Sequence, residues 1–160
     1  MSQVYCYHQA PIGQLLLVGK ENTLTGIYFP KTWTDENIGG YVEKKSNFTL
    51  ITKQLDEYFS GKRQVFNLLL EMTGTKFQKQ VWQELTKIPY GTTSSYGEIA
   101  KQINNPKACR AVGMANNKNP IPIIIPCHRV IGKNGSLTGF GGGFDVKQQL
   151  LDLERKTVNY

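Results

Sequence analysis

Cysteine and histidine are scarce in this chain of 160 residues, which contains three cysteines and two histidines. Three cysteines cannot all pair within one chain, so the disulfide framework of a small secreted domain is not expected, and a reducing compartment fits better. Cys6 and His8 could contact one metal ion, but a structural zinc site needs four ligands, and the sequence offers no second pair of ligands beside these two. We therefore predict no metal site.

Long apolar runs are also absent. No stretch reaches the roughly 18 apolar residues that a membrane-spanning helix needs, and the N-terminus lacks a basic region followed by an apolar segment. We expect no contact with a membrane and a location in the cytoplasm, or in the nucleus of a eukaryote. Hydrophobic residues make up 39% and charged residues 19% of the chain, so we expect it to fold, as one domain or a compact pair. We also expect a monomer.

Acidic residues are few compared with basic ones. Nineteen Lys and Arg against twelve Asp and Glu give a formal net charge of +7, and the isoelectric point is near 9.3. An excess of positive charge suits a polyanionic partner such as nucleic acid. It also keeps proteins in solution, so the charge alone favours neither interpretation.

The N-terminal region has the pattern of an α/β domain. Apolar clusters separated by glycine-containing turns predict three strands of a meander within the first 30 residues. Residues 31–47 are polar and are predicted to form a loop. In residues 48–59 apolar side chains recur at helical spacing, and this helix should cover one face of the sheet. Residues 65–72 are predicted to form a further strand or an extended linker. We therefore predict a small antiparallel sheet with one helix in residues 1–72.

A cluster of threonine and glycine at residues 73–75 marks the boundary to a second domain, residues 73–160. Thr75 is placed to cap the next helix. Ser95 and Glu98 have the spacing of a capping box for another. This domain is predicted to be mostly α-helical.

Two short helices joined by a tight turn are predicted to resemble a helix-turn-helix, although an αα-hairpin with a solvated polar face has the same pattern. Asn105 is placed to cap the second of them, residues 107–117, and Asp145 is placed to cap the last helix of the chain. The second helix carries Arg110 and is rich in small residues. Small side chains let a backbone lie close to a neighbouring helix or to the floor of a groove. They are Ala108, Ala111, Gly113 and Ala115.

The string Pro126-Cys127-His128-Arg129-Val130 follows an apolar run that must be buried. A thiolate is the nucleophilic form of cysteine, and a neighbouring histidine or cation favours it. We therefore expect an ionised Cys127 beside its imidazole on a rigid segment. A Cys-His pair alone is weak evidence, because most such pairs are ordinary core or surface residues.

The same string resembles the active-site signature of the 6-O-alkylguanine-DNA alkyltransferases, which take an alkyl group from damaged guanine onto their own cysteine. The resemblance covers roughly residues 73–155. Further segments that follow the family order are Ser95-Tyr96-Gly97-Glu98-Ile99-Ala100, Arg110-Ala111-Val112-Gly113, Asn119-Pro120 and the stretch 150–154. The resemblance implies a ribonuclease-H-like α/β domain followed by a mostly α domain of the winged helix-turn-helix type.

The resemblance also implies a reaction. Cys127 would be the nucleophile and His128 the base, with Glu154 orienting the histidine in a relay that contains water. By spacing alone, Glu154 would be a solvent-facing helix residue. The thioether product has no easy leaving path, so the reaction would run once per molecule, without a cofactor.

The implied partner is double-stranded DNA containing 6-O-alkylguanine. A stacked base cannot reach a buried thiol, so the nucleotide must be flipped out. Tyr96 resembles the tyrosine that presses on the phosphate 3′ to the target and donates its hydroxyl to the guanine, and Arg110 resembles the arginine that fills the vacated stack. By themselves, one tyrosine and one arginine on helices are usually packing and solubility residues. The second helix would enter the minor groove, where little bulk is tolerated. The other predicted DNA contacts are Asn105, Ala108, Ala111 and Gly113.

The remaining predicted site residues surround the flipped base. Asn119 resembles the asparagine that ties the recognition helix to the active-site segment. The carbonyls of Cys127 and Val130 would accept from the guanine amino group, and the amide of Gly141 would point at the exocyclic oxygen. Phe140 stands where the family often has tyrosine, and some members have serine in place of Gly141, so we expect an apolar wall and a pocket roomy enough for larger alkyl groups.

Two other functions fit parts of the sequence. One is a DNA-binding module without chemistry, as in alkyltransferase-like proteins that replace the cysteine, but Cys127, His128 and Glu154 together argue against it. The other is a cysteine hydrolase, for which the helix-turn-helix and the basic charge provide no peptide cleft. Intact mass after mixing with a methylated-guanine oligonucleotide separates the three functions. An alkyltransferase keeps a permanent methyl adduct, a DNA-binding module shows no adduct, and a hydrolase returns to its starting mass.

Overall fold

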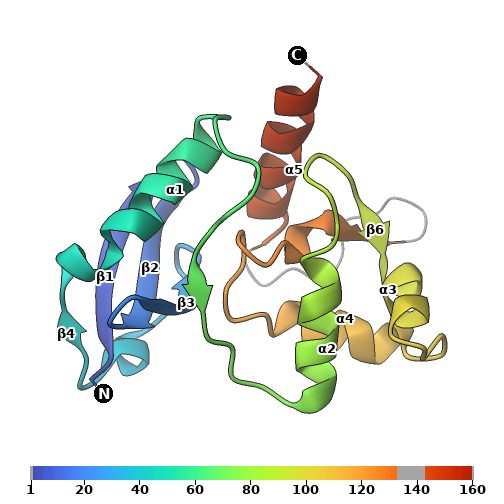
Figure 1. Cartoon of the computed structure of the whole chain (residues 1–160), viewed down its shortest axis with the longest axis horizontal. Coiled ribbons are helices and arrows are strands. Elements are labelled where there is room, and N and C mark those ends of the chain that lie inside the picture. Colours follow the sequence, from blue (N-terminus) through green and yellow to red (C-terminus); the bar gives the residue numbers. More distant parts are fainter. Residues whose placement is uncertain (1, 133–142, 160) are drawn as a thin grey trace. The chain divides into compact units, whose positions relative to one another are not determined.

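The computed structural model describes residues 2–132 and 143–159 and divides the chain into two compact units, Met1–Met72 and Thr73–Tyr160 (Figure 1). Each unit has its own buried apolar residues, as expected of separate folding units. Among the described residues, no helix is long and apolar enough to cross a bilayer.

The first unit is built on a five-stranded sheet. Its strands are β1 (Val4–Ala10), β2 (Gly13–Lys20), β3 (Thr23–Tyr28), β4 (Val42–Glu43) and β5 (Leu69–Leu70). They lie in the order β4-β1-β2-β3-β5, and the antiparallel meander predicted for β1, β2 and β3 is confirmed. β4 and β5 pair in parallel with β1 and β3, so the sheet is mixed rather than wholly antiparallel. Both have two residues; β4 lies in the predicted loop, whereas β5 lies in residues 65–72, for which a strand was one of the two predictions.

The predicted helix forms as α1 (Thr49–Phe59), which lies along one face of the sheet (Figure 1). His8 Nε2 on β1 is 2.7 Å from Asp56 Oδ1 on α1, which joins the two layers. The central strand β2 is buried from Leu15 to Val18 without interruption, the pattern of a strand covered on both faces.

The segments on either side of α1 contain more structure than the predicted loop and linker. Residues 31–47 include two short 3-10 helices, η1 (Asp35–Ile38) and η2 (Lys45–Phe48). After α1, the buried Gln54 carboxamide donates to the carbonyl of Asn67 at 3.1 Å and accepts from its amide at 2.9 Å. Gln54 thus binds the backbone of the extended segment that leads into β5.

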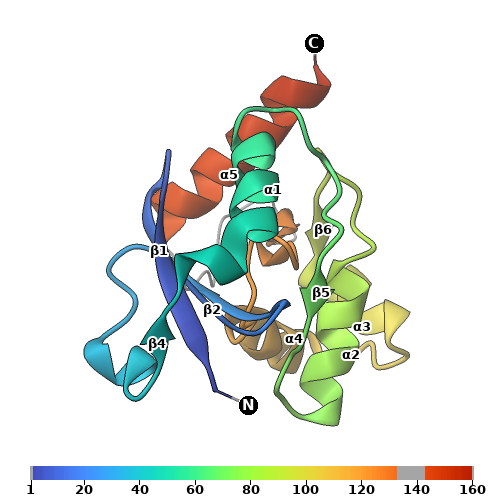
Figure 2. The same ribbon diagram turned by 60° about the vertical axis from the view of Figure 1, so that its left-hand side comes forward.

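The second unit is mostly helical (Figure 2). α4 packs against α2 and α3, and the two short strands pair in parallel. Trp82 on α2 donates its indole N–H to the carbonyl of Ala115 on α4 at 2.8 Å, which links two buried helix faces. The elements are α2 (Lys76–Leu85), β6 (Ser94–Ser95), α3 (Tyr96–Gln102), α4 (Cys109–Asn117), η3 (Cys127–Arg129), β7 (Val130–Ile131) and α5 (Phe144–Val158).

Two predicted helix caps form. Thr75 Oγ1 accepts from the Gln78 amide at 3.1 Å, and the Gln78 side chain accepts from the Thr75 amide at 2.9 Å, a complete capping box for α2. Ser95 Oγ accepts from the Glu98 amide at 3.1 Å at the start of α3. The return bond from the Ser95 amide to the Glu98 side chain does not form, so only half of the predicted capping box is present; the Glu98 carboxylate lies 3.9 Å from Lys101 Nζ.

Two other predicted caps were wrong. α4 begins at Cys109 with Ala108 as its N-cap. The backbone carbonyl of Asn105 instead accepts from the Ala108 amide at 3.0 Å in the preceding turn. The start is delayed because Asn104 has φ = +59°, a left-handed conformation that separates α3 from the turn. Asp145 lies inside the first turn of α5, and Gly143 is the N-cap. There its charge favours the positive end of the helix dipole.

Candidate active site

The segment that carries the cysteine is held by one asparagine side chain. Asn119, just after α4, donates from Nδ2 to the carbonyl of Ile125 at 2.7 Å, and its Oδ1 accepts from the Ile121 amide at 3.0 Å. These two bonds close a tight turn in which Ile123 has φ = +76°, a costly conformation for a β-branched residue. The turn places the end of α4 beside the Cys127 segment, as the family resemblance implies for Asn119.

Cys127 is buried, with 5% of its surface exposed. Its carbonyl accepts from Asn116 Nδ2 at 3.3 Å and from the Val130 amide. Burial raises the pKa of the thiol to about 11, although a hydrogen bond with Asn119 and the charge of Lys147 act in the opposite direction. The resting thiol is therefore neutral at pH 7, contrary to the ionised form expected from the sequence, because desolvation outweighs the neighbouring charges.

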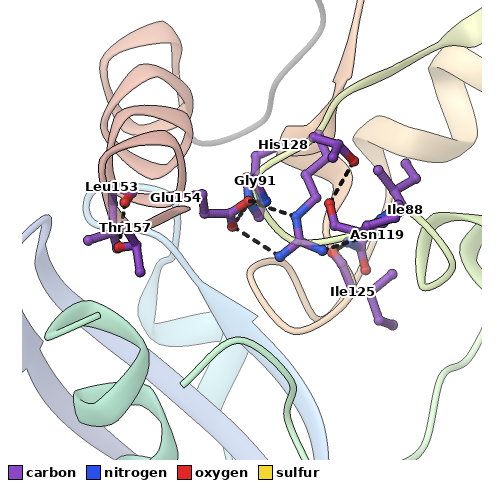
Figure 3. A network of polar contacts seen from close by, with 11 residues as sticks. Ile88, Gly91, Asn119, Ile125, His128, Leu153, Glu154 and Thr157 are labelled. Atoms are coloured by element: carbon purple, nitrogen blue, oxygen red, sulfur yellow. Dashed lines mark hydrogen bonds and ion pairs between the residues drawn. The ribbon is translucent and has the colours of Figure 1, made fainter. Parts of the chain in front are cut away.

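His128, Arg129 and Glu154 form a buried group of charged or polar side chains, and the first two directly follow the cysteine in sequence. Figure 3 labels His128 and Glu154 of this group. Glu154 projects from α5 towards His128, and its Oε2 lies 2.6 Å from His128 Nε2. Arg129 donates from Nε to Glu154 Oε1 at 2.8 Å and from Nη2 to Oε2 at 3.1 Å. The amide of Gly91 completes the set at 3.3 Å from Oε1. The carboxylate thus accepts four donors, and its burial excludes the solvent-facing position that spacing alone suggested.

The charges in this group follow from the contacts. Burial by itself would raise the pKa of the Glu154 carboxyl, but hydrogen bonds and charges from His128 and Arg129 lower it to about 2, so it is ionised. Burial lowers the pKa of His128; Glu154 acts to raise it, while Arg129 and Lys147 lower it further. His128 is therefore neutral at pH 7. Because an ionised carboxylate can only accept, Nε2 carries the proton and Nδ1 holds the lone pair.

Lys147 is a site residue that the sequence analysis missed. Its side chain is fully buried, and Nζ donates to the carbonyl of Val130 at 2.6 Å. Burial lowers its pKa to about 8, and Cys127 acts in the opposite direction. One signal was available: Lys147 and Glu154 are seven residues apart, about two helical turns, on the face that also buries Leu150. The face that predicts burial of the leucine predicts theirs too.

The residues predicted to contact DNA lie on α3, α4 and the turn between them. Tyr96 begins α3 and is half-buried; a Cβ placed on Gly113 would lie 3.8 Å from its ring, an ordinary van der Waals distance, so Gly113 lies next to the tyrosine. Arg110 and Ala111 in the first turn of α4 are exposed, as is Asn105, and Ala108 is half-buried.

Not every small residue of α4 faces outwards. Ala115 is buried against α2, whereas Met114 is 66% exposed, so the outer surface of the helix is not made of small side chains alone. Phe140 and Gly141, the predicted pocket wall and oxygen contact, lie outside the described residues.

The excess positive charge lies entirely in the second unit. Residues 1–72 contain seven basic and seven acidic residues, whereas residues 73–160 contain twelve basic and five acidic ones, which accounts for the net +7. A neutral unit joined to a strongly basic one concentrates attraction for a polyanion on the second unit. In the described part of the chain, no group of three or more His, Cys, Asp or Glu side chains could hold a metal ion.

Comparison with known proteins matches both units. A family model described as "6-O-methylguanine DNA methyltransferase, ribonuclease-like domain" matches residues 3–72. Another, "6-O-methylguanine DNA methyltransferase, DNA binding domain", matches residues 76–156. The predicted fold class, a ribonuclease-like α/β domain followed by a helical DNA-binding domain, is thereby confirmed.

Individual relatives match over nearly their whole length. The methylated-DNA--protein-cysteine methyltransferase of Methanosarcina acetivorans is 50% identical over 151 residues, 94% of this chain and 97% of that protein. The protein of the same name from Methanosarcina mazei is 51% identical over 155 residues, which are 95% of this chain and 98% of that protein. Mycobacterium tuberculosis OGT in a crystal structure with DNA is 45% identical with a TM-score of 0.92, covering 96% of this chain and 94% of that one.

Proposed function

The chain belongs to the 6-O-methylguanine DNA methyltransferase family, and from this premise we propose that it repairs DNA by transferring a methyl or larger alkyl group from 6-O-alkylguanine to Cys127, irreversibly and once per molecule. The observation that carries the proposal is the buried His128–Glu154 pair, 2.6 Å long, directly after a buried thiol. A surface Cys-His pair would have no reason to hold its histidine in one tautomer away from water.

The chemistry starts from a neutral thiol, so a proton must leave as the sulfur attacks. His128 Nδ1 is the lone pair that receives it, through a water molecule in the relay that the family resemblance implies. Sulfur forms a bond to the alkyl carbon while the bond between that carbon and the guanine oxygen breaks. The departing guanine anion takes up one proton and His128 returns to its neutral form, so over the whole reaction the proton lost by the thiol ends on the guanine. Glu154 stabilises the imidazolium that forms.

A buried thiol constrains how the substrate arrives. The alkylated base must leave the stack and enter the protein, with Tyr96 and Arg110 acting on the DNA side of the site. α4 supplies the surface for the minor groove, and the basic second unit supplies attraction to the phosphates. The Val130 carbonyl already accepts from Lys147, but a carbonyl has two lone pairs, so it can also accept from the guanine amino group.

The product is a thioether at Cys127, and no group in the proposed site offers a path to remove it. The reaction therefore consumes the protein. We propose double-stranded DNA with 6-O-alkylguanine as the only partner required, a monomer as the active form, and a location where the chromosome is, the cytoplasm or a eukaryotic nucleus.

Intact mass spectrometry tests the proposal. The protein is mixed with duplex DNA carrying 6-O-methylguanine, and one methyl group per molecule is expected, located on Cys127 by peptide mapping. Cys127→Ala should give no adduct, and Cys109→Ala, which removes the exposed cysteine, should give the full adduct. An adduct on another residue, or repair of the lesion by Cys127→Ala, would overturn the proposal.

A further inference from the structure

Arg129 makes more contacts with Glu154 than His128 does, although the proposed reaction assigns it no role. We propose that Arg129 is a positioning residue for proton transfer: by binding both oxygens of Glu154 it keeps His128 neutral, with the Nδ1 lone pair ready for the Cys127 proton. This inference rests on the function proposed above.

The geometry divides the carboxylate between two partners. Arg129 Nε and Nη2 lie 2.8 and 3.1 Å from Oε1 and Oε2, while His128 Nε2 shares only Oε2, at 2.6 Å. A bidentate pair of this kind has a defined plane, so the arginine also fixes the direction in which Oε2 faces the imidazole. The orientation of His128 is therefore set by a residue that does not touch it through a hydrogen bond.

The arginine itself cannot turn elsewhere. Nη1 donates to the carbonyl of Ile88 at 2.8 Å, and the guanidinium carbon lies 5.5 Å from the centre of the Tyr90 ring. Only 6% of Arg129 is exposed. It is thus withdrawn from any contact with DNA phosphates, the usual task of an arginine in a basic domain, and its positive charge acts inside the protein.

The charge count explains what Arg129 does for the base. A buried carboxylate alone beside an imidazole favours the imidazolium, whose Nδ1 already carries a proton and cannot accept another. With Arg129 present, Glu154 and Arg129 sum to zero, so protonation of His128 adds an uncompensated positive charge at a site from which water is excluded. The charged or titratable groups around His128 are Glu154 and Lys147 on α5 and Cys127 and Arg129 on η3, with Tyr90 beyond the arginine.

The lone pair is in the expected state. His128 is fully buried, and Nδ1 finds no hydrogen-bond partner among the described residues. No protein donor among those residues occupies the lone pair, so it is available to the water of the proposed relay.

The test separates charge from packing. The rate of methyl transfer in a single turnover is measured against pH for the wild type, Arg129→Gln and Arg129→Lys, with Arg63→Gln as a matched control in the half-exposed Arg63–Glu57 pair. Arg129→Gln should move the acid limb of the profile to a midpoint about one pH unit higher, since a charge within a few ångströms has been removed. Arg129→Lys retains the charge and should keep the wild-type midpoint, and Arg63→Gln should change nothing.

A structural role predicts a different result. If Arg129 only supports the fold, Gln and Lys should lower the rate by the same factor at every pH and leave the midpoint unchanged, which would overturn the proposal. NMR titration of His128 in Cys127→Ala gives a second readout that needs no DNA and no repair activity. The imidazole should titrate below the ordinary value of 6.5, and adding Arg129→Gln should raise its pKa. The same pKa with and without Arg129 would overturn the role of Arg129 even if the wild type forms the adduct. Absence of the adduct with a depressed His128 titration would instead reject the proposed function.

Discussion

Replacing Glu154 with glutamine should cost about 3 kcal/mol of folding stability at neutral pH. The substitution keeps the shape of the side chain and removes its charge. Glu154 is only 1% exposed, so its interactions with Arg129 and His128 are little screened by solvent. Arg129 then remains buried beside a neutral amide. The NH2 group of the glutamine is itself a donor, and it would face the N–H donors of Arg129 or His128.

Two independent arguments give this magnitude. A carboxyl that binds its proton at about pH 2 rather than at 4.5 contributes about 3 kcal/mol to the free energy of unfolding, at 1.36 kcal/mol for each pH unit. Removing one partner of a buried ion pair costs about 3–5 kcal/mol in other proteins. Because the pKa of Glu154 is lowered in the folded state, this stability is complete above pH 4.5 and is lost as the pH falls towards 2.

Chemical denaturation of the wild type and Glu154→Gln at several pH values measures the effect. The difference in unfolding free energy should be about 3 kcal/mol at pH 7 and should shrink as the pH falls through the interval from 4.5 to 2. Glu57→Gln in the half-exposed pair with Arg63 should cost less than about 1 kcal/mol. Equal stability of Glu154→Gln and the wild type at pH 7, or a difference that does not vary with pH, would refute the electrostatic account of this site.

Three further results are expected. Iodoacetamide at pH 7 should label the exposed Cys109 within minutes and leave Cys127 unlabelled, because burial keeps the Cys127 thiol neutral; rapid labelling of Cys127 in mapped peptides would contradict this. Lys147 costs stability while charged, since its pKa is lowered from 10.5 to about 8, and this cost should disappear as the pH passes from 8 to 10.5. In denaturation experiments the stability of the wild type relative to Lys147→Met should therefore rise over that interval, a comparison in which the contributions of the other titrating groups cancel. Arg110→Ala should weaken DNA binding and alter its salt dependence in fluorescence titrations, whereas Lys53→Ala in the neutral first unit should leave both unchanged.

Much of the fold was determined by local sequence. The alternation and turns of residues 2–30 predict the three-stranded meander, and helical spacing predicts α1 and α2, because each pattern repeats over two or more periods. The cap at Thr75 depends on residues three apart in the chain and formed as predicted, and Gln78 extends it to a capping box. The candidate nucleophile was also accessible, since the string at Cys127 is contiguous and its family signature is specific.

Tertiary structure decided the parts that depend on residues distant in sequence. β4 is too short to carry a period, and the choice between strand and linker for residues 65–72 was settled only by the pairing of β5 with β3. Both pairings are parallel because of where the chain returns to the sheet. The burial of Glu154 and Lys147, and the use of Arg129 inside the protein rather than on DNA, depend on α5 packing against η3. The sequence predicted an ionised Cys127, whereas burial raises the pKa of its thiol and keeps it neutral. The sequence shows the neighbouring histidine but not how deeply the cysteine is buried, and desolvation has the larger effect on the pKa.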